Sequence, residues 1–223
     1  MMKRTLLNIP ILLGLVVIDL ITPNVERAFT RGGHSLSPLQ IVIVAVVSVL
    51  SIAYFVYWGK TQKYAEWSFK NFWKNKGKII LGLLSVYAAL IVVGIIMAGL
   101  KLEHTVSANQ QTLNGLVKLE PFLLIWFTTA IAAPIMEETI FRLGIFKLLF
   151  PDKDKIALVV SAILFAGAHM TTEITNFTAW LPYLAAGLIL GFLYYKTKKI
   201  EVTVSVHVLW NTLSMIFSAL LMR

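Results

Sequence analysis

Long apolar segments joined by short polar connections run through the whole of this 223-residue chain. A helix needs about 20 mainly apolar residues to cross the hydrocarbon of a bilayer. The segments that meet this requirement are 5–22, 39–58, 79–100, 121–149, 156–176, 178–195 and 200–222. Because no soluble domain fits between them, we predict an all-α fold. It would be a single integral membrane domain over 1–223, a multi-pass bundle of about seven transmembrane helices in the cell membrane.

Composition supports a membrane protein and argues against a nucleic-acid-binding one. Hydrophobic residues make up 58% of the chain and charged residues 14%, whereas about 25% of residues in soluble domains are charged. The net charge is +9, but the Lys and Arg residues lie between apolar segments, as in membrane proteins generally. We therefore expect membrane lipids as partners and no nucleic acid. The chain has no cysteine, which excludes disulfides and thiolate chemistry.

The basic residues predict an orientation. With seven crossings, the Lys- and Arg-rich segments at 3–4, 60–78, 147–155 and 196–199 share one side, and the positive-inside rule puts the N-terminus in the cytoplasm. The segment 60–78 is then a cytoplasmic basic amphipathic loop. It is either an interfacial helix with Ala65, Phe69 and Phe72 on one face, or a positive loop with aromatic anchors.

Three ionisable residues lie close together inside the fourth apolar segment, in the run Glu137-Glu138-Thr-Ile-Phe-Arg142. Each costs about 2.5–3.5 kcal/mol on insertion scales, so such residues usually pair and serve a function. Glu138 and Arg142 are four apart and can pair on one helical face. Glu137 points about 100° away and can face a cavity as a general base. Pro134, one turn earlier, should kink the helix and free a carbonyl nearby.

Two other apolar segments each carry one histidine. His169 follows small residues in Phe165-Ala-Gly-Ala-His169, and His207 lies four residues before Asn211. Asn211 can therefore bind the same ligand as His207 or orient its ring. A glutamate and two histidines around one water can activate it and stabilise an oxyanion, with or without a metal. Singly, each polar residue is as well explained as a helix–helix partner, but the set favours a functional site.

Two further features have structural explanations. Gly187 and Gly191 form a small-xxx-small pair in the sixth segment, which predicts close helix packing. Asp19 lies near the outer end of the first segment, and we expect it to be interfacial and not catalytic.

The three motifs together resemble the CPBP family of intramembrane proteases, which includes type II CAAX prenyl endopeptidases and the Abi proteins. The family pattern is Glu-Glu-x-x-x-Arg, then Phe-x-x-x-His, then His-x-x-x-Asn on successive core helices. All three motifs occur here in that order, within residues 120–215. This region is therefore expected to be a CPBP-like catalytic core, whereas the first three segments are not diagnostic.

The resemblance implies a peptidase whose site opens toward the cytoplasm and whose substrate is a membrane-associated peptide or protein. The catalytic residues that it implies are Glu137, Glu138, Arg142, His169, His207 and Asn211. Glu137 would activate water, and the two histidines with Asn211 would hold that water or stabilise the oxyanion. The Glu138–Arg142 pair would shape the site.

Metal dependence stays open at this point. The family is usually labelled metallopeptidase, and Glu137, His169 and His207 would then hold a divalent metal such as Zn. The chain lacks the helical His-Glu-x-x-His zinc signature, so a metal-free glutamate mechanism without a cofactor is equally consistent. Serine chemistry is disfavoured because no Gly-x-Ser-Gly lies in a span, and aspartyl chemistry because Asp19 has no membrane aspartate to pair with.

The resemblance also suggests biological roles. Bacterial relatives accompany peptide toxin or bacteriocin systems, which implies precursor maturation or self-immunity. Two other classes are considered: a non-enzymatic immunity or scaffold protein that binds a toxin or sensor, and a small proton-coupled transporter. A pure binder would not need the whole Glu and His set, and a proton relay would place ionisable groups at several depths. An endopeptidase is therefore the favoured function.

Overall fold

The computed structural model describes residues 2–31, 33–102 and 107–221, and all regular elements in these ranges are helices. The predicted all-α fold is confirmed. In chain order the elements are α1 (Met2–Asp19), α2 (Ile21–Phe29), α3 (Pro38–Thr61), α4 (Phe69–Lys74), α5 (Lys76–Gly99), α6 (Ala108–Leu119), α7 (Phe122–Ile125), the π-helix η1 (Trp126–Ala132), α8 (Ala133–Glu138), the π-helix η2 (Thr139–Leu149), α9 (Asp154–His169), α10 (Phe177–Thr197) and α11 (Ile200–Leu221).

Within the described residues, 6 helices are long and apolar enough to cross a membrane, one fewer than the sequence predicts. The difference lies in the predicted segment 156–176. Its helix α9 has only 16 residues, and at 1.5 Å per residue it is shorter than the roughly 30 Å of bilayer hydrocarbon. The chain leaves the helix after His169, where Glu173 and Asn176 hydrogen-bond to each other and Asn176 caps α10. The last predicted segment reached residue 222, which lies outside the described residues.

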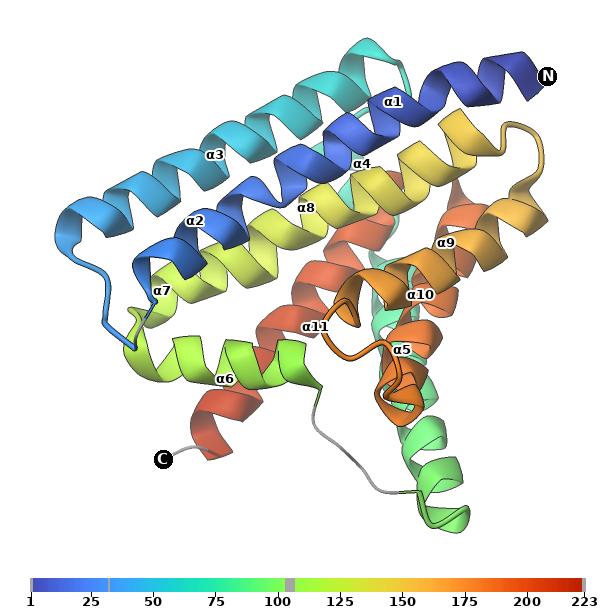
Figure 1. Ribbon diagram of the computed structural model, residues 1–223. Coiled ribbons are helices and arrows are strands. Elements are labelled where there is room, and N and C mark those ends of the chain that lie inside the picture. Colours follow the sequence, from blue (N-terminus) through green and yellow to red (C-terminus); the bar gives the residue numbers. More distant parts are fainter. Residues whose placement is uncertain (1, 32, 103–106, 222–223) are drawn as a thin grey trace.

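The helices form two groups that meet at α11 and along the contact between α9 and η2 (Figure 1). In the first group, α1 and α2 pack with α3 and with the continuous rod from α7 to η2. In the second group, α10 packs against α9 and α5. α11 contacts α5 on one side and η1 and α8 on the other. The helix that carries His207 therefore lies directly against the helix that carries the two glutamates.

The segment 60–78 is not one amphipathic helix. The segment contains the end of α3 and the start of α5, and between these helices only Phe69–Lys74 is helical, so Ala65 does not share a helical face with Phe69 and Phe72 as the sequence suggested. The segment is tied to the start of α11, because Lys199 pairs with Glu66 at 3.1 Å and Glu201 accepts a bond from the Ser68 amide. These polar contacts, together with the packing of Ala65, Trp67 and Phe72 against the main core, hold the segment in place.

Three of the four predicted basic segments come together at one end of the bundle. Lys63, Lys147, Lys198 and Lys199 line one surface depression there. This placement agrees with the grouping expected from the sequence, while the cytoplasmic N-terminus stays a prediction.

Gly187 allows α10 to approach α9 closely. A Cβ atom at this position would lie 3.1 Å from the Ala162 backbone and 3.2 Å from the Phe165 ring. At Gly191 the nearest atoms, from Leu158, would be 3.7 Å away, which is ordinary contact. The predicted small-xxx-small packing is thus confirmed, with Gly187 as the tight contact.

We expect Gly187→Ala to lower the free energy of unfolding by about 1–3 kcal/mol, because the added methyl overpacks the α9–α10 contact. Gly191→Ala is the matched control. It carries the same intrinsic helix gain of about 1 kcal/mol without the clash, so it should leave stability unchanged or raise it. Thermal unfolding in detergent measures both, and equal melting temperatures for the two variants would contradict the packing argument.

Candidate functional site

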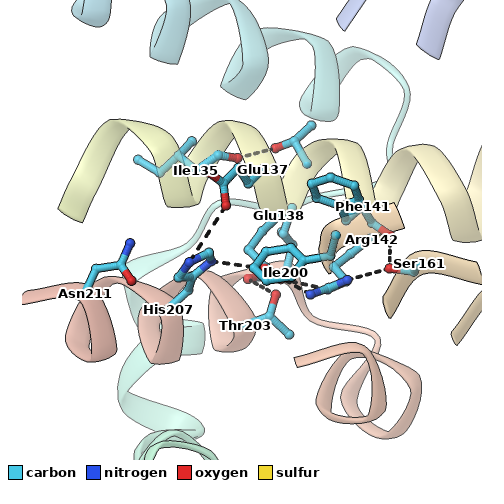
Figure 2. A network of polar contacts seen from close by, with 12 residues as sticks. Ile135, Glu137, Glu138, Phe141, Arg142, Ser161, Ile200, Thr203, His207 and Asn211 are labelled. Carbon is cyan, nitrogen blue, oxygen red and sulfur yellow. Dashed lines mark hydrogen bonds and ion pairs between the residues drawn. The ribbon is translucent and has the colours of Figure 1, made fainter. Parts of the chain in front are cut away.

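Glu137, His169 and His207 converge on one point within the bundle. The Oε2 atom of Glu137 lies 3.9 Å from Nε2 of His169 and 3.8 Å from Nε2 of His207. That oxygen is buried and has no hydrogen-bond partner. In Figure 2, Glu137 on α8 points across toward His207 on α11. The predicted meeting of one carboxylate and two imidazoles is therefore present, with gaps too long for direct hydrogen bonds.

Glu138 faces the other way, into a fully buried network (Figure 2). Arg142 donates to both of its oxygens, from Nε at 2.9 Å and from Nη2 at 3.2 Å. Arg142 also donates from Nη1 to the Ser161 hydroxyl, which in turn donates to the Phe141 carbonyl. Glu138 and Arg142 both have no exposed side-chain surface. The predicted i,i+4 pair is confirmed, and its bidentate geometry is the strong form of such a pair.

The hydrogen bonds of the two histidines fix which ring nitrogen faces Glu137. Nδ1 of His169 lies 2.9 Å from the Phe165 carbonyl, which can only accept. Nδ1 of His207 lies 3.2 Å from the Glu138 carboxylate. Both Nδ1 atoms must therefore be donors, and in the neutral ring each Nε2 then carries a lone pair. Both lone pairs point to the side where Glu137 lies.

Aromatic rings hold both imidazoles in place. Phe165 packs against His169 at 4.7 Å and against His207 at 5.7 Å between ring centroids. Tyr183 stacks on His169 at 4.6 Å and Trp210 stacks on His207 at 5.5 Å. Each histidine thus contacts two aromatic rings, which restricts the orientation of its plane.

Asn211 binds the backbone of the glutamate-bearing rod. Its Nδ2 donates to the Thr129 carbonyl at 3.0 Å. One residue earlier, the backbone N–H of Ala133 donates a hydrogen bond to the Thr128 carbonyl in π-helical register. The next donor in that register would be the N–H of residue 134. Because Pro134 has no N–H, the Thr129 carbonyl is left free and Asn211 supplies the missing donor. The freed carbonyl that the sequence predicted is found here.

The structure brings in residues that the motifs did not indicate. Ser161 and Tyr183 contact Arg142 and His169 only through tertiary packing, and the sole sequence signal was their polar or aromatic character within apolar segments. Trp210 lies three residues after His207 on α11, so its stacking on that ring follows from helix spacing. Asp19 is the last residue of α1, and its expected interfacial place stays a prediction.

A divalent metal would need the three converging atoms of Glu137, His169 and His207 as ligands. Nitrogen and carboxylate donors are a suitable set for Zn. Across the described ranges, however, no group of three or more His, Cys, Asp or Glu side chains is arranged so that it could hold a metal ion. The metal assignment therefore stays a prediction.

Comparison with known proteins gives a family and named relatives. The family profile described as type II CAAX prenyl endopeptidase Rce1-like matches residues 119–213. The chain is 30% identical over 189 residues to the UPF0177 protein YvdC of Lactococcus lactis, covering 84% of this chain and 70% of the relative. It is also 30% identical over 149 residues to the membrane-embedded CAAX protease MroQ of Staphylococcus aureus, covering 63% of this chain and 57% of that protein. No solved structure matches. With its candidate spans, the chain is a multi-pass membrane protein.

Removing Arg142 should be more damaging than removing the whole ion pair. Arg142→Gln leaves the fully buried Glu138 without its main partner, so we expect a loss of about 3–5 kcal/mol in unfolding free energy. The double variant Glu138→Gln with Arg142→Gln carries no buried charge and should be more stable than the single variant. Unfolding in detergent tests this, and a double variant weaker than Arg142→Gln would contradict it.

The Asn211–Thr129 bond predicts a specific rescue. Asn211→Ala leaves the part-buried Thr129 carbonyl unsatisfied and should cost about 1–3 kcal/mol. In a Pro134→Ala background, the restored amide can bond to Thr129 itself, so the same Asn211→Ala change should cost much less. The measurement is a double-mutant cycle on thermal unfolding. An equal loss of stability in both backgrounds would show that Pro134 is not the reason why the Thr129 carbonyl lacks a backbone donor.

Proposed function

This chain belongs to the Rce1-like type II CAAX prenyl endopeptidase family of membrane proteases, and from that premise we propose that it is an intramembrane endopeptidase in which Glu137 activates water. One observation carries the proposal: the buried Oε2 of Glu137 has no hydrogen-bond partner and faces two imidazole nitrogens at 3.8 and 3.9 Å. A water between these groups could donate one O–H to Oε2 of Glu137 and the other to one of the two Nε2 atoms. The Glu137 and His169 side chains are 17% and 16% exposed, which leaves a path for water.

In the proposed reaction, Glu137 takes a proton from the water, and the water oxygen attacks the carbonyl carbon of the scissile peptide bond. The carbonyl oxygen becomes an oxyanion. A protonated His207 would donate to it from Nε2, because its Nδ1–H is already held by the Glu138 carboxylate. When the carbon–nitrogen bond breaks, Glu137 gives the proton to the leaving amine. Arg142 and Asn211 are positioning residues, since Arg142 holds Glu138 and Asn211 holds the rod that carries Glu137.

A divalent metal, if present, would polarise the carbonyl and lower the pKa of the water. Glu137, His169 and His207 would hold it. The contribution of Glu138 as partner of His207 is the same in either case, because a carboxylate behind a histidine fixes its tautomer and orientation.

We further propose that the substrate is a membrane-associated or precursor peptide and that the N-terminus of the enzyme is cytoplasmic. Maturation of a peptide toxin or bacteriocin, or self-immunity against one, is the proposed setting. The convergence of all three reactive groups supports an enzyme over a pure binding protein, since binding alone would not require it.

The test is a comparison of the peptides in cells that express the native protein or Glu137→Gln. The amide cannot accept the proton, so products should fall by about 10²–10⁴-fold while the protein still inserts and folds. Glu66→Gln is the control, because Glu66 is an exposed glutamate outside the site. An identical set of peptides with native protein and Glu137→Gln would refute the proposal.

A further inference from the structure

A mainly apolar cavity of about 300 Å³ lies beside the two histidines, between α5, α10 and α11. Its apolar walls are Leu90, Met97, Pro182, Tyr183 and Trp210. Ser107 and Gln110 of the α6 N-terminus also line it. Of the described residues that line the cavity, none is charged. Its chemistry therefore suits an uncharged apolar group.

The cavity shares two walls with the candidate site. The Tyr183 ring stacks on His169 at 4.6 Å and an interplanar angle of 23°, and the Trp210 ring stacks on His207 at 5.5 Å and 27°. One face of each ring thus lies against an imidazole, while the same side chain borders the cavity. A group bound in the cavity is separated from the histidines by only one aromatic layer.

Polar contacts fix the Tyr183 wall. Its hydroxyl lies 2.9 Å from the hydroxyl of Ser107, the residue that caps α6. Glu173, from the turn after His169, accepts a hydrogen bond from the Ala108 amide. The α6 N-terminus is thereby bound both to the cavity wall and to the loop that follows His169. The wall is preformed, which lowers the entropic cost of binding a ligand.

We propose that this cavity is the subsite for a large apolar side chain of the peptide substrate next to the scissile bond, with Tyr183 and Trp210 as specificity-determining residues. This inference rests on the proposed endopeptidase function. A cavity of about 150 Å³ is enough to hold benzene, so the volume here accommodates a leucine, methionine or phenylalanine side chain. The absence of charge among the lining residues disfavours acidic or basic side chains at the same position.

The cavity lies nearer one end of the bundle than the other. Met97 lies near the C-terminal end of α5, and Ala179 lies in the first turn of α10. The basic segments lie at the opposite ends of these helices, around Lys76 and Lys196. An apolar side chain would therefore occupy the half of the bundle farthest from the basic segments.

The test uses the Glu137→Gln protein in liposomes, so that binding is measured without cleavage. The probe is a short leucine–alanine peptide that carries one photoreactive benzoylphenylalanine. Crosslinks mapped by mass spectrometry should fall in α10 and α11. Adding Ser214→Leu fills the cavity and should reduce crosslinking about tenfold, the scale on which a hydrophobic pocket discriminates. Ala179→Leu fills the cavity from α10 and should reduce crosslinking to a similar extent, so it replaces Ser214→Leu where that variant folds poorly.

Ser85→Leu is the matched control, because the Ser85 hydroxyl bonds only within its own helix and the residue does not line the cavity. It should leave crosslinking unchanged, and a probe with aspartate in place of leucine should crosslink weakly. If both cavity-filling variants crosslink as Ser85→Leu does, the subsite is wrong even where the native protein cleaves peptides. If crosslinking follows the prediction but Glu137→Gln leaves cellular peptides unchanged, the endopeptidase proposal fails and the binding site stands.

Discussion

The buried ion pair between Glu138 and Arg142 is the interaction on which the rest of the site depends. Two charges without exposed surface are stable in a bundle core only if every strong donor and acceptor has a partner. Here Arg142 bonds to both carboxylate oxygens and to Ser161, and the carboxylate also meets His207. The pair therefore connects the glutamate rod, α9 and α11, and it aligns one imidazole in doing so. Because the buried charges need partners from all three elements, the ion pair also restricts how these helices can lie relative to one another.

The irregular backbone around the glutamates likewise needs a hydrogen-bond partner from another helix. In a membrane, non-helical hydrogen bonding is tolerated only where other protein groups satisfy the backbone. Pro134 removes a donor between two π-helical stretches, and Asn211 replaces it by bonding to Thr129. Asn211, which bonds to the carbonyl left free by Pro134, is thus on the same helix as His207. One side chain compensates for the proline and also holds the two halves of the site in register.

Local spacing predicted much of the site, because some contacts depend only on helix geometry. The i,i+4 pairing of Glu138 with Arg142 and the separate direction of Glu137 follow from 3.6 residues per turn. Contacts between helices did not follow in this way. The bond from Asn211 to Thr129 and the stacking of Tyr183 on His169 depend on how helices cross, which no single-segment pattern contains. The predicted span ran on to residue 176 although most residues after Met170 are polar, and hydrogen bonds among these polar residues end the helix at His169.

Two adjacent glutamates have opposite environments, and this contrast is the strongest reason to give them different roles. Glu138 is fully buried and its oxygens are bonded by Arg142 and His207, so it can orient a partner but has no free acceptor for a substrate proton. Glu137 is partly exposed, and its Oε2 has no bond within the protein. A turn of about 100° between neighbours on a helix separates these two environments. Exchanging the two roles would require the rod to rotate, which the network at Arg142 prevents.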